Sequence, residues 1–241
     1  MAAASYAHLA PWTRYQRASC LRTLLRELHR YYGAPDLTAA VPRVIPPRPR
    51  NVTATDEERR QLLDNAPLHL RCFLLLCSDM ALRSGTAVKV APEHYDAGRG
   101  TLTVKTKFDD ALVLPVTEEL KALFAVSRGP VDQPYVVALN PRGSGGLRRS
   151  RAANLEAVRG ALLIQTRRLR FALGITKRII PHDLRRTTAV RLYENTHDLR
   201  TVSAVLGHRA LPQTLHYLDH AVQEVPQSLL EAAKAKGGFD A

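Results

Sequence analysis

The sequence predicts a mainly α-helical protein with one small antiparallel β-sheet, an α+β fold. Two observations predict this fold. Apolar residues recur at helical spacing in most segments, whereas β-branched residues concentrate in two short segments, 101–104 and 111–116, that a polar stretch separates. The 241 residues suffice for one well-packed domain with a smaller appendage, or for two small domains.

The first fifty residues are expected to form one helix and a stiff connector. Between Arg14 and Tyr32, leucines share one helical face, arginines line the neighbouring one, and Gly33 follows as a helix end. From Val41 to Arg50, four prolines are mixed with three arginines, which is typical of an extended, basic connector. We therefore place a domain boundary there, with domains at 1–50 and 51–241.

The second domain is expected to be mostly helical. Thr55 followed by Glu58 is the pattern of a capping box opening a helix through Leu63, and 67–82 predicts a second, strongly buried helix. The two β-branched segments then form a hairpin with an exposed tip. Further helices are expected at about 117–126, 152–173, 182–194 and 198–206, through Tyr217, and as a short amphipathic tail within 222–235.

The charge balance indicates a nucleic-acid partner. Lys and Arg number 35 against 22 Asp and Glu, a net charge of +13 with a pI near 10.2. Aromatic residues make up only 6% of the chain, which favours recognition of double-stranded DNA through its phosphates over stacking on single strands. The candidate DNA contacts are arginines of the connector and of a glycine-containing loop at 140–151: Arg43, Arg48, Arg50, Arg148, Arg149 and Arg151.

Other classes of partner find little support in the sequence. The longest wholly apolar run, 72–77, is far shorter than the ~18 residues of a membrane span. Neither a Gly-Lys-Ser/Thr phosphate loop nor an ordered set of metal ligands is present, so a metal nuclease fits poorly. We expect a soluble protein of the bacterial or archaeal cytoplasm that needs no cofactor, metal or membrane.

Two short motifs could carry chemistry on a phosphate. In Pro181-His-Asp-Leu-Arg-Arg, His182 and Arg185 are three positions apart and share a face near a helix N-terminus, where an anion is favoured. Downstream, His208 follows Leu-Gly at a helix end, and Tyr217 comes nine residues later. Each motif alone also fits solvated charges, a capping turn or a surface tyrosine. The segment 198–217 equally fits a helix-turn-helix that reads DNA without catalysis.

The ordered set of six residues resembles the signature of the tyrosine recombinase (phage integrase) family. The match runs from about Thr55 to Asp219 and includes Pro115, eight residues beyond the hairpin lysine. The set comprises Arg83, Lys107, His182, Arg185, His208 and Tyr217. The resemblance implies the catalytic-domain fold of this family and site-specific DNA recombination, with a type IB topoisomerase as the alternative enzyme.

The resemblance also implies a role for each residue. Tyr217 would attack the scissile phosphate, which Arg83 and Arg185 would bind. His182 would accept a proton or contact the phosphate, His208 would hydrogen-bond a non-bridging oxygen, and Lys107 would protonate the leaving 5′ oxygen. These transfers suit the residue types, because a phenol with a pKa near ~10 must lose its proton and an alkoxide must gain one. The phosphotyrosine bond retains the energy for rejoining, so no cofactor is implied.

This sequence departs from the family pattern at two places. Thr86 stands where the family usually has glutamate, three residues after the first arginine. Asp109 and Asp110 lie beside Lys107, and nearby carboxylates raise the pKa of a lysine and repel phosphate, so Lys105 is the alternative acid.

The resemblance finally bears on assembly. Residues 1–50 resemble only the last helix and linker of the family's four-helix core-binding domain, so we expect weak, salt-sensitive DNA binding by the chain alone. Tails of the family dock on a neighbouring protomer, and the tail predicted here fits that role as well as packing on its own domain. We expect a homotetramer when two DNA sites are bound.

Overall fold

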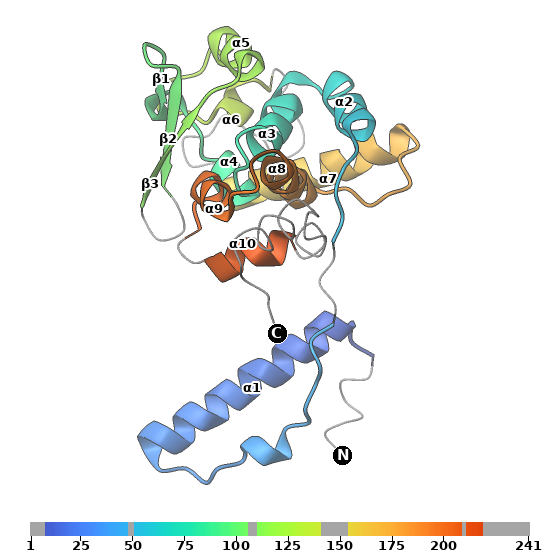
Figure 1. Ribbon diagram of the computed structural model, residues 1–241, viewed down its shortest axis with the longest axis vertical. Coiled ribbons are helices and arrows are strands. Elements are labelled where there is room, and N and C mark those ends of the chain that lie inside the picture. The colour runs from blue at the N-terminus through green and yellow to red at the C-terminus, as the bar shows by residue number, and fades with distance from the viewer. Residues whose placement is uncertain (1–7, 48–50, 106–109, 141–153, 209–210, 219–241) are drawn as a thin grey trace, which may run out of the picture. The chain divides into compact units, whose positions relative to one another are not determined.

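The computed structural model describes residues 8–47, 51–105, 110–140, 154–208 and 211–218, which form two compact units, 1–50 and 51–241 (Figure 1). In the first unit, α1 (Pro11–Tyr32) starts with proline at its first position and ends at Gly33, whose φ of 65° is left-handed. The 3-10 helix η2 (Thr38–Ala40) follows. The guanidinium of Arg22 donates to the carbonyl oxygen of Val41 at 2.6 Å, which holds the connector against α1.

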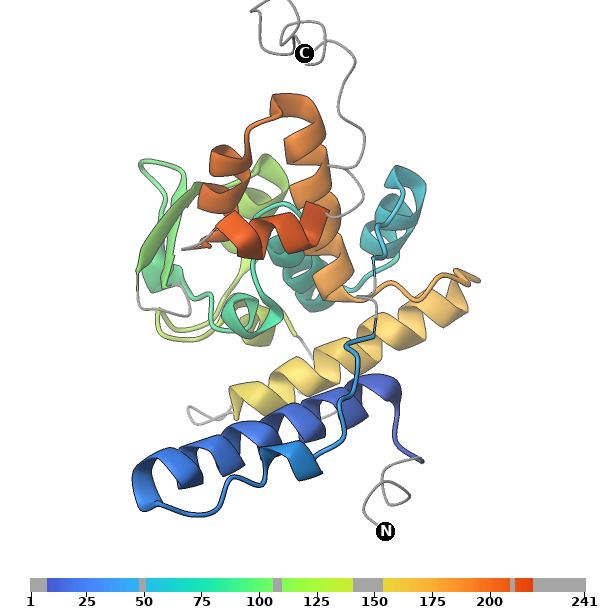
Figure 2. The ribbon, with the colours of Figure 1, turned by 60° about the horizontal axis from the view of Figure 1, so that its bottom comes forward.

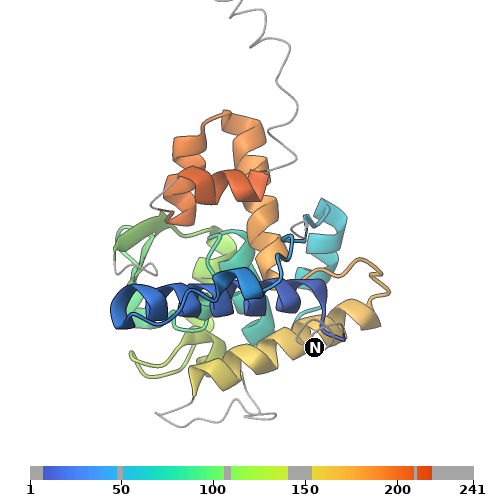
Figure 3. The same ribbon diagram turned by 90° about the horizontal axis from the view of Figure 1, so that it is seen from below.

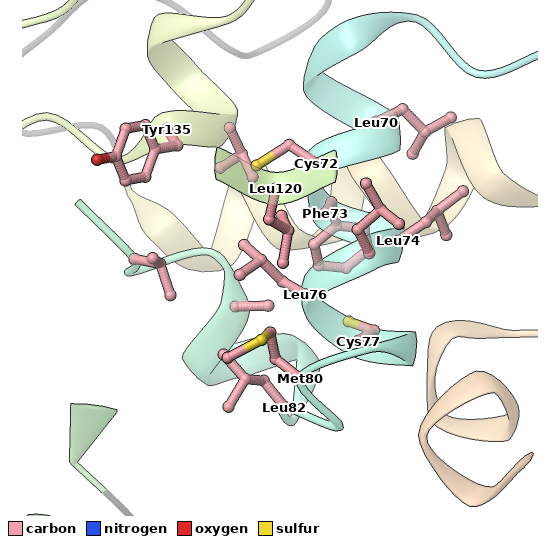
Figure 4. Packing of buried hydrophobic residues seen from close by; sticks show 14 of the residues in the cluster. Leu70, Cys72, Phe73, Leu74, Leu76, Cys77, Met80, Leu82, Leu120 and Tyr135 are labelled. Atoms are coloured by element: carbon pink, nitrogen blue, oxygen red, sulfur yellow. The ribbon is translucent and has the colours of Figure 1, made fainter. Parts of the chain in front are cut away.

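The second unit is built around a buried helix. The helix α2 (Asp56–Asp64) opens with the predicted capping box: Thr55 Oγ1 accepts from the backbone N–H of Glu58 at 3.1 Å, and Glu58 accepts from Thr55 at 2.8 Å. The next helix, α3 (Leu68–Ser78), has nine buried residues. Figure 4 shows its Phe73 and Leu76 among apolar side chains from the turn after α3 and from the later helices α5 and α6.

The prediction that α3 continues to Leu82 is wrong. The helix ends at Ser78, and the N–H of Leu82 bonds back to the carbonyl of Leu76 at 2.9 Å. Ala81 has a left-handed φ of 48°, which a helix does not allow. The apolar pattern continued to Leu82 because residues 80–82 are buried in the core, although they form a turn. A short helix, α4 (Ser84–Ala87), follows this turn.

One small sheet has three antiparallel strands in the order β1-β2-β3. The hairpin of β2 (Thr101–Lys105) and β3 (Ala111–Pro115) pairs Thr101 with Pro115 and Lys105 with Ala111. Leu102 and Val104 are buried and alternate with exposed residues, as on a half-buried strand. The sequence missed β1 (Tyr95–Asp96), which has only two residues, and the 3-10 helix η3 (Pro92–His94) before it.

Six more helices complete the described part of the second unit. They are α5 (Glu118–Val126), α6 (Tyr135–Ala138), α7 (Leu155–Ala172), α8 (Pro181–Thr196), α9 (Leu199–Leu206) and α10 (Leu211–Leu218). The helices α8, α9 and α10 pack against one another (Figure 2), and α8 also packs on α3. The long helix α7 lies on the side of the unit away from α9 and α10 (Figure 3). The mainly helical fold with one antiparallel sheet is therefore confirmed.

The segment that enters the second unit is fastened to α8. The buried hydroxyl of Thr187 accepts from the backbone N–H of Ala54 at 2.8 Å and donates to the carbonyl of Asp183 at 2.8 Å. Arg186, also on α8, donates to the side chain of Asn51. These bonds fix the chain at 51–54 to the helix that carries His182 and Arg185.

Candidate active site

The first turn of α8 carries two of the predicted site residues. Pro181 occupies the first helical position, and the carboxylate of Asp183 accepts from the backbone N–H of Ile180 at 2.8 Å. This bond secures a helix N-terminus, where backbone N–H groups favour a bound anion. His182 is exposed on this turn, whereas Arg185, three residues later, is buried with only 2% of its surface exposed.

Arg185 is held by three acceptors from two other segments of the chain. Its guanidinium donates to the carbonyl oxygen of Ala81, to that of Leu206 at 2.8 Å, and to His208 Nε2 at 3.2 Å. Ala81 lies in the turn before Arg83, and Leu206 ends α9. A buried guanidinium needs such partners, because desolvating an unpaired charge is costly. The bonds bring three distant stretches of sequence to one point.

The hydrogen bonds of His208 define its protonation. A guanidinium has only donors, so Nε2 of His208 is the acceptor and the ring is neutral in the described arrangement. The proton of the neutral ring then lies on Nδ1, which donates to Thr214 Oγ1 at 3.0 Å. Burial, and after it the positive charges of Arg185, Arg83 and His182 in that order, together lower the pKa of His208 to about 4. His208 is therefore neutral near pH 7.

Arg83 and His182 line one pocket of about 720 Å³ in the second unit. Three Lys or Arg side chains, Arg83, Lys89 and Lys105, face a single carboxylate there, Glu156, which Arg159 binds at 2.9 Å. This charge balance suits a phosphate. The full lining comprises Arg83, Ser84, Gly85, Thr86, Lys89, Val90, His94, Val104, Lys105, Glu156 and His182.

One departure from the family pattern and the alternative general acid both line this pocket. Thr86 lines it where the family usually has glutamate. Lys105, the alternative general acid, lies at the end of β2 and lines it as well. Lys107 lies outside the described residues. The pocket therefore presents the hydroxyl of Thr86 and the exposed ammonium of Lys105.

Tyr217 lies within α10, but its side chain is not among those that the structure describes. The start of α10 follows Gly207, whose φ of 59° is left-handed as predicted for the end of α9. Thr214, on the same helix, is fully buried.

The predicted DNA contacts are only partly within the described residues. Arg43 is exposed in the first unit. That unit also has a pocket of about 260 Å³, lined by Arg22 and Arg26 together with Tyr15, Ala18, Ser19, Thr23 and Val44. The remaining predicted contacts, and the predicted tail helix at 222–235, lie outside the described residues: Arg48, Arg50, Arg148, Arg149 and Arg151.

Several contributors to the site escaped the sequence analysis, among them Ala81, Thr214 and the pocket residues Lys89, His94 and Glu156. Thr214 had one available signal, its position three residues before Tyr217. Ala81 had none, because a left-handed alanine cannot be recognised from the surrounding apolar residues. Among the residues described, no cluster of His, Cys, Asp or Glu is arranged to hold a metal ion, and no helix is long and apolar enough to cross a membrane.

Curated relatives of this chain include tyrosine recombinases. The chain is 27% identical over 235 residues to tyrosine recombinase XerC of Erythrobacter litoralis, covering 88% of this chain and 70% of the relative. It is 25% identical over 168 residues to tyrosine recombinase XerC of Chlamydia pneumoniae, covering 67% of this chain and 50% of the relative. The chain thus spans half of the second relative's length.

Solved structures show the same fold. The XerH site-specific recombinase bound to difH substrate aligns with a TM-score of 0.66 and 20% identity, over 96% of this chain and 67% of that one. A lambda integrase dimer bound to a COC′ core site aligns with a TM-score of 0.65 and 19% identity, over 88% of this chain and 60% of that one. The family model described as the phage integrase family matches residues 53–224, most of the second unit. The chain therefore belongs to the phage integrase family.

Proposed function

We propose that this chain is a site-specific DNA recombinase that cuts and rejoins double-stranded DNA through a covalent 3′-phosphotyrosine at Tyr217. One observation carries the proposal. Arg185 and His208 are hydrogen-bonded to each other, and both Arg83 and His182, which line the basic pocket, act electrostatically on His208. Four of the six residues of the family signature thus belong to one cluster.

The cluster supplies what phosphoryl transfer requires. Negative charge grows on the non-bridging oxygens in the transition state, and preorganised guanidinium groups stabilise it without reorganising. Arg185 is preorganised by its bonds to Ala81 and Leu206. Arg83 approaches the pocket from the neighbouring turn. We assign both arginines to the scissile phosphate.

In the cleavage step, the phenolic oxygen of Tyr217 attacks phosphorus and the bond from phosphorus to the 5′ oxygen breaks. The phenolic proton passes to His182, which is exposed to the pocket. The leaving oxygen takes a proton from Lys107 or Lys105 and departs as a 5′ hydroxyl. Attack by a 5′ hydroxyl of a partner duplex reverses each transfer and restores a phosphodiester.

The DNA contacts of the proposal come from exposed basic groups. Arg43 and the pocket of Arg22 and Arg26 in the first unit suit backbone phosphates, which position a protein on DNA without reading sequence. The arginines at 148, 149 and 151 are further candidates. Four protomers holding two duplexes would perform a complete exchange. The lambda integrase tetramer bound to a Holliday junction, of which 58% aligns with this chain, supports that assembly.

Trapping the covalent intermediate tests the proposal. The wild-type chain is mixed with randomly nicked duplexes of random sequence, so that a nick close to a cleavage site lets the short 5′-hydroxyl fragment diffuse away. A denaturing wash then retains only covalent protein–DNA adducts, and sequencing of the retained DNA reveals the target. Tyr217→Phe removes the attacking oxygen and should yield no adduct.

Tyr193→Phe is the matched control, because Tyr193 lies in the second half of α8. It should form adducts as the wild type does. If wild-type protein that binds DNA forms no adduct, the chain is a DNA-binding member without catalysis. Relaxation of supercoiled plasmid without strand exchange would favour a topoisomerase instead.

A further inference from the structure

The helix that carries Tyr217 is linked to the phosphate-binding residues by one buried hydroxyl. Thr214 lies on α10, has none of its surface exposed, and receives the hydrogen bond of His208 Nδ1 at 3.0 Å. His208 in turn accepts from Arg185 at 3.2 Å. A continuous chain of hydrogen bonds therefore runs from Arg185 through the imidazole ring to α10.

We propose that Thr214 is a positioning residue for strand cleavage: its hydroxyl holds the ring of His208 and ties the Tyr217 helix to Arg185. This inference rests on the proposed function. The bond from His208 Nδ1 to Thr214 Oγ1 carries this role, so Thr214 acts through the ring of His208 and, by the same bond, on the placement of α10.

The chemistry of the ring explains why a hydroxyl acceptor is suited to this place. While Nε2 accepts from Arg185, the proton must lie on Nδ1, and Thr214 Oγ1 receives it. A phosphate that arrives at the arginines favours protonation of His208, whose Nε2–H can then donate to a phosphate oxygen. Nδ1 carries a proton in both states. Thr214 therefore keeps the ring in one orientation while Nε2 changes from acceptor to donor.

Ser203 of α9 restrains the backbone of His208, so the effect of Thr214 on the side chain can be measured separately. The backbone N–H of His208 donates to the carbonyl of Ser203 at 3.0 Å, and the Ser203 hydroxyl donates to the carbonyl of His208 at 3.1 Å. These bonds fix the backbone at the end of α9. The bond to Thr214 joins the side chain of His208 to α10, so its loss should change the orientation of the ring without releasing the turn at the end of α9.

The first test measures single-turnover adduct formation on the target DNA. Thr214→Val keeps the shape of the side chain and removes the acceptor, and it should slow adduct formation about tenfold with DNA affinity unchanged. Thr214→Ser restores the hydroxyl and should return the rate to within about threefold of wild type. A wild-type rate for Thr214→Val, or a Thr214→Ser variant as slow as Thr214→Val, overturns the inference.

A double-mutant cycle separates positioning from a loss of packing. If Thr214 acts through His208, then Thr214→Val should have little further effect in a His208→Ala background. An undiminished tenfold loss in that background shows a role independent of His208 and overturns the inference. Wild-type protein that forms no adduct at all refutes the proposed function instead, so the two failures are distinguishable.

A measurement on the unaltered protein covers the case in which the valine variant does not fold. Nitrogen-15 spectra of histidine-labelled wild-type protein near pH 7 report the tautomer of each ring, and the His208 signals are those missing from His208→Gln. The inference requires a proton on Nδ1. A ring with its proton on Nε2 contradicts it.

Discussion

The guanidinium of Arg185 donates a hydrogen bond to the backbone carbonyl of Ala81, a residue 104 positions earlier whose φ is 48°. Ala81 is fully buried and lies two residues before Arg83. The left-handed turn therefore presents its carbonyl to one arginine while it leads the chain into the other. Local strain in the turn is maintained by the surrounding packing and by this bond.

Arg185→Lys should destabilise the fold as well as impair cleavage. Lysine keeps the charge, but a single ammonium cannot reach Ala81, Leu206 and His208 with the geometry of a guanidinium. We expect the free energy of unfolding to fall by about 2–4 kcal/mol in urea titrations. Adduct formation should fall at least about 100-fold. Arg168→Lys, an exposed change on α7, should stay within about 0.5 kcal/mol of wild type. Equal stability of the two variants contradicts the assigned role.

Glycine substitutions at two buried alanines should have different effects. At Ala81, glycine relieves a left-handed strain of about 1 kcal/mol, which offsets its greater freedom in the unfolded chain. Ala81→Gly should therefore change the free energy of unfolding by less than about 1 kcal/mol. Ala87 is equally buried but helical in α4, so Ala87→Gly should cost at least about 1 kcal/mol. Thermal unfolding of both variants checks that Ala87→Gly is the more destabilising. If Ala81→Gly destabilises more, the backbone at Ala81 is not strained.

The sequence predicted those features of the fold that residues close together in the chain determine. Thr55 and Glu58 form their capping box within four residues, so the start of α2 was predictable. The end of α3 was not, because the turn at Ala81 is held by Arg185 from a distant helix. The helices α4 and α6 have four residues each, and β1 has two, which is too short for a periodic pattern.

The candidate site also has a part that the sequence predicted and a part that it did not. The order and spacing of Arg83, His182, Arg185 and His208 along the chain indicated a single site, and the fold places their charges within mutual influence. The contact of His208 with Thr214 joins the end of α9 to α10. Such a contact depends on how two helices pack, which spacing in the sequence does not determine.

The titration of His208 should appear in the pH dependence of stability. Its folded pKa is about 4, below the ordinary 6.5, because of burial and of the charges on Arg185, Arg83 and His182. Between these values the unfolded chain binds a proton at His208 that the folded chain does not, so the contribution of His208 lowers stability as pH drops from about 6.5 to about 4 and is constant below. His208→Gln should show a shallower fall in urea titrations across that window. An identical slope in both proteins contradicts the lowered pKa.

Sulfur substitution at the leaving oxygen should decide which hairpin lysine is the general acid. A 5′-bridging sulfur leaves as a thiolate, whose conjugate acid has a pKa near ~8.5, so departure needs no proton from the protein. Lys107→Ala should slow cleavage of ordinary DNA about 100-fold and cut the sulfur-containing DNA within a few-fold of the wild-type rate. Lys105, which lines the pocket beside Arg83, should show only a modest loss on both substrates when changed to alanine. Because the two lysines are two positions apart in the sequence, each variant serves as the other's control. Rescue by sulfur of Lys105→Ala but not of Lys107→Ala would assign the proton to Lys105, and rescue of neither would place the general acid elsewhere.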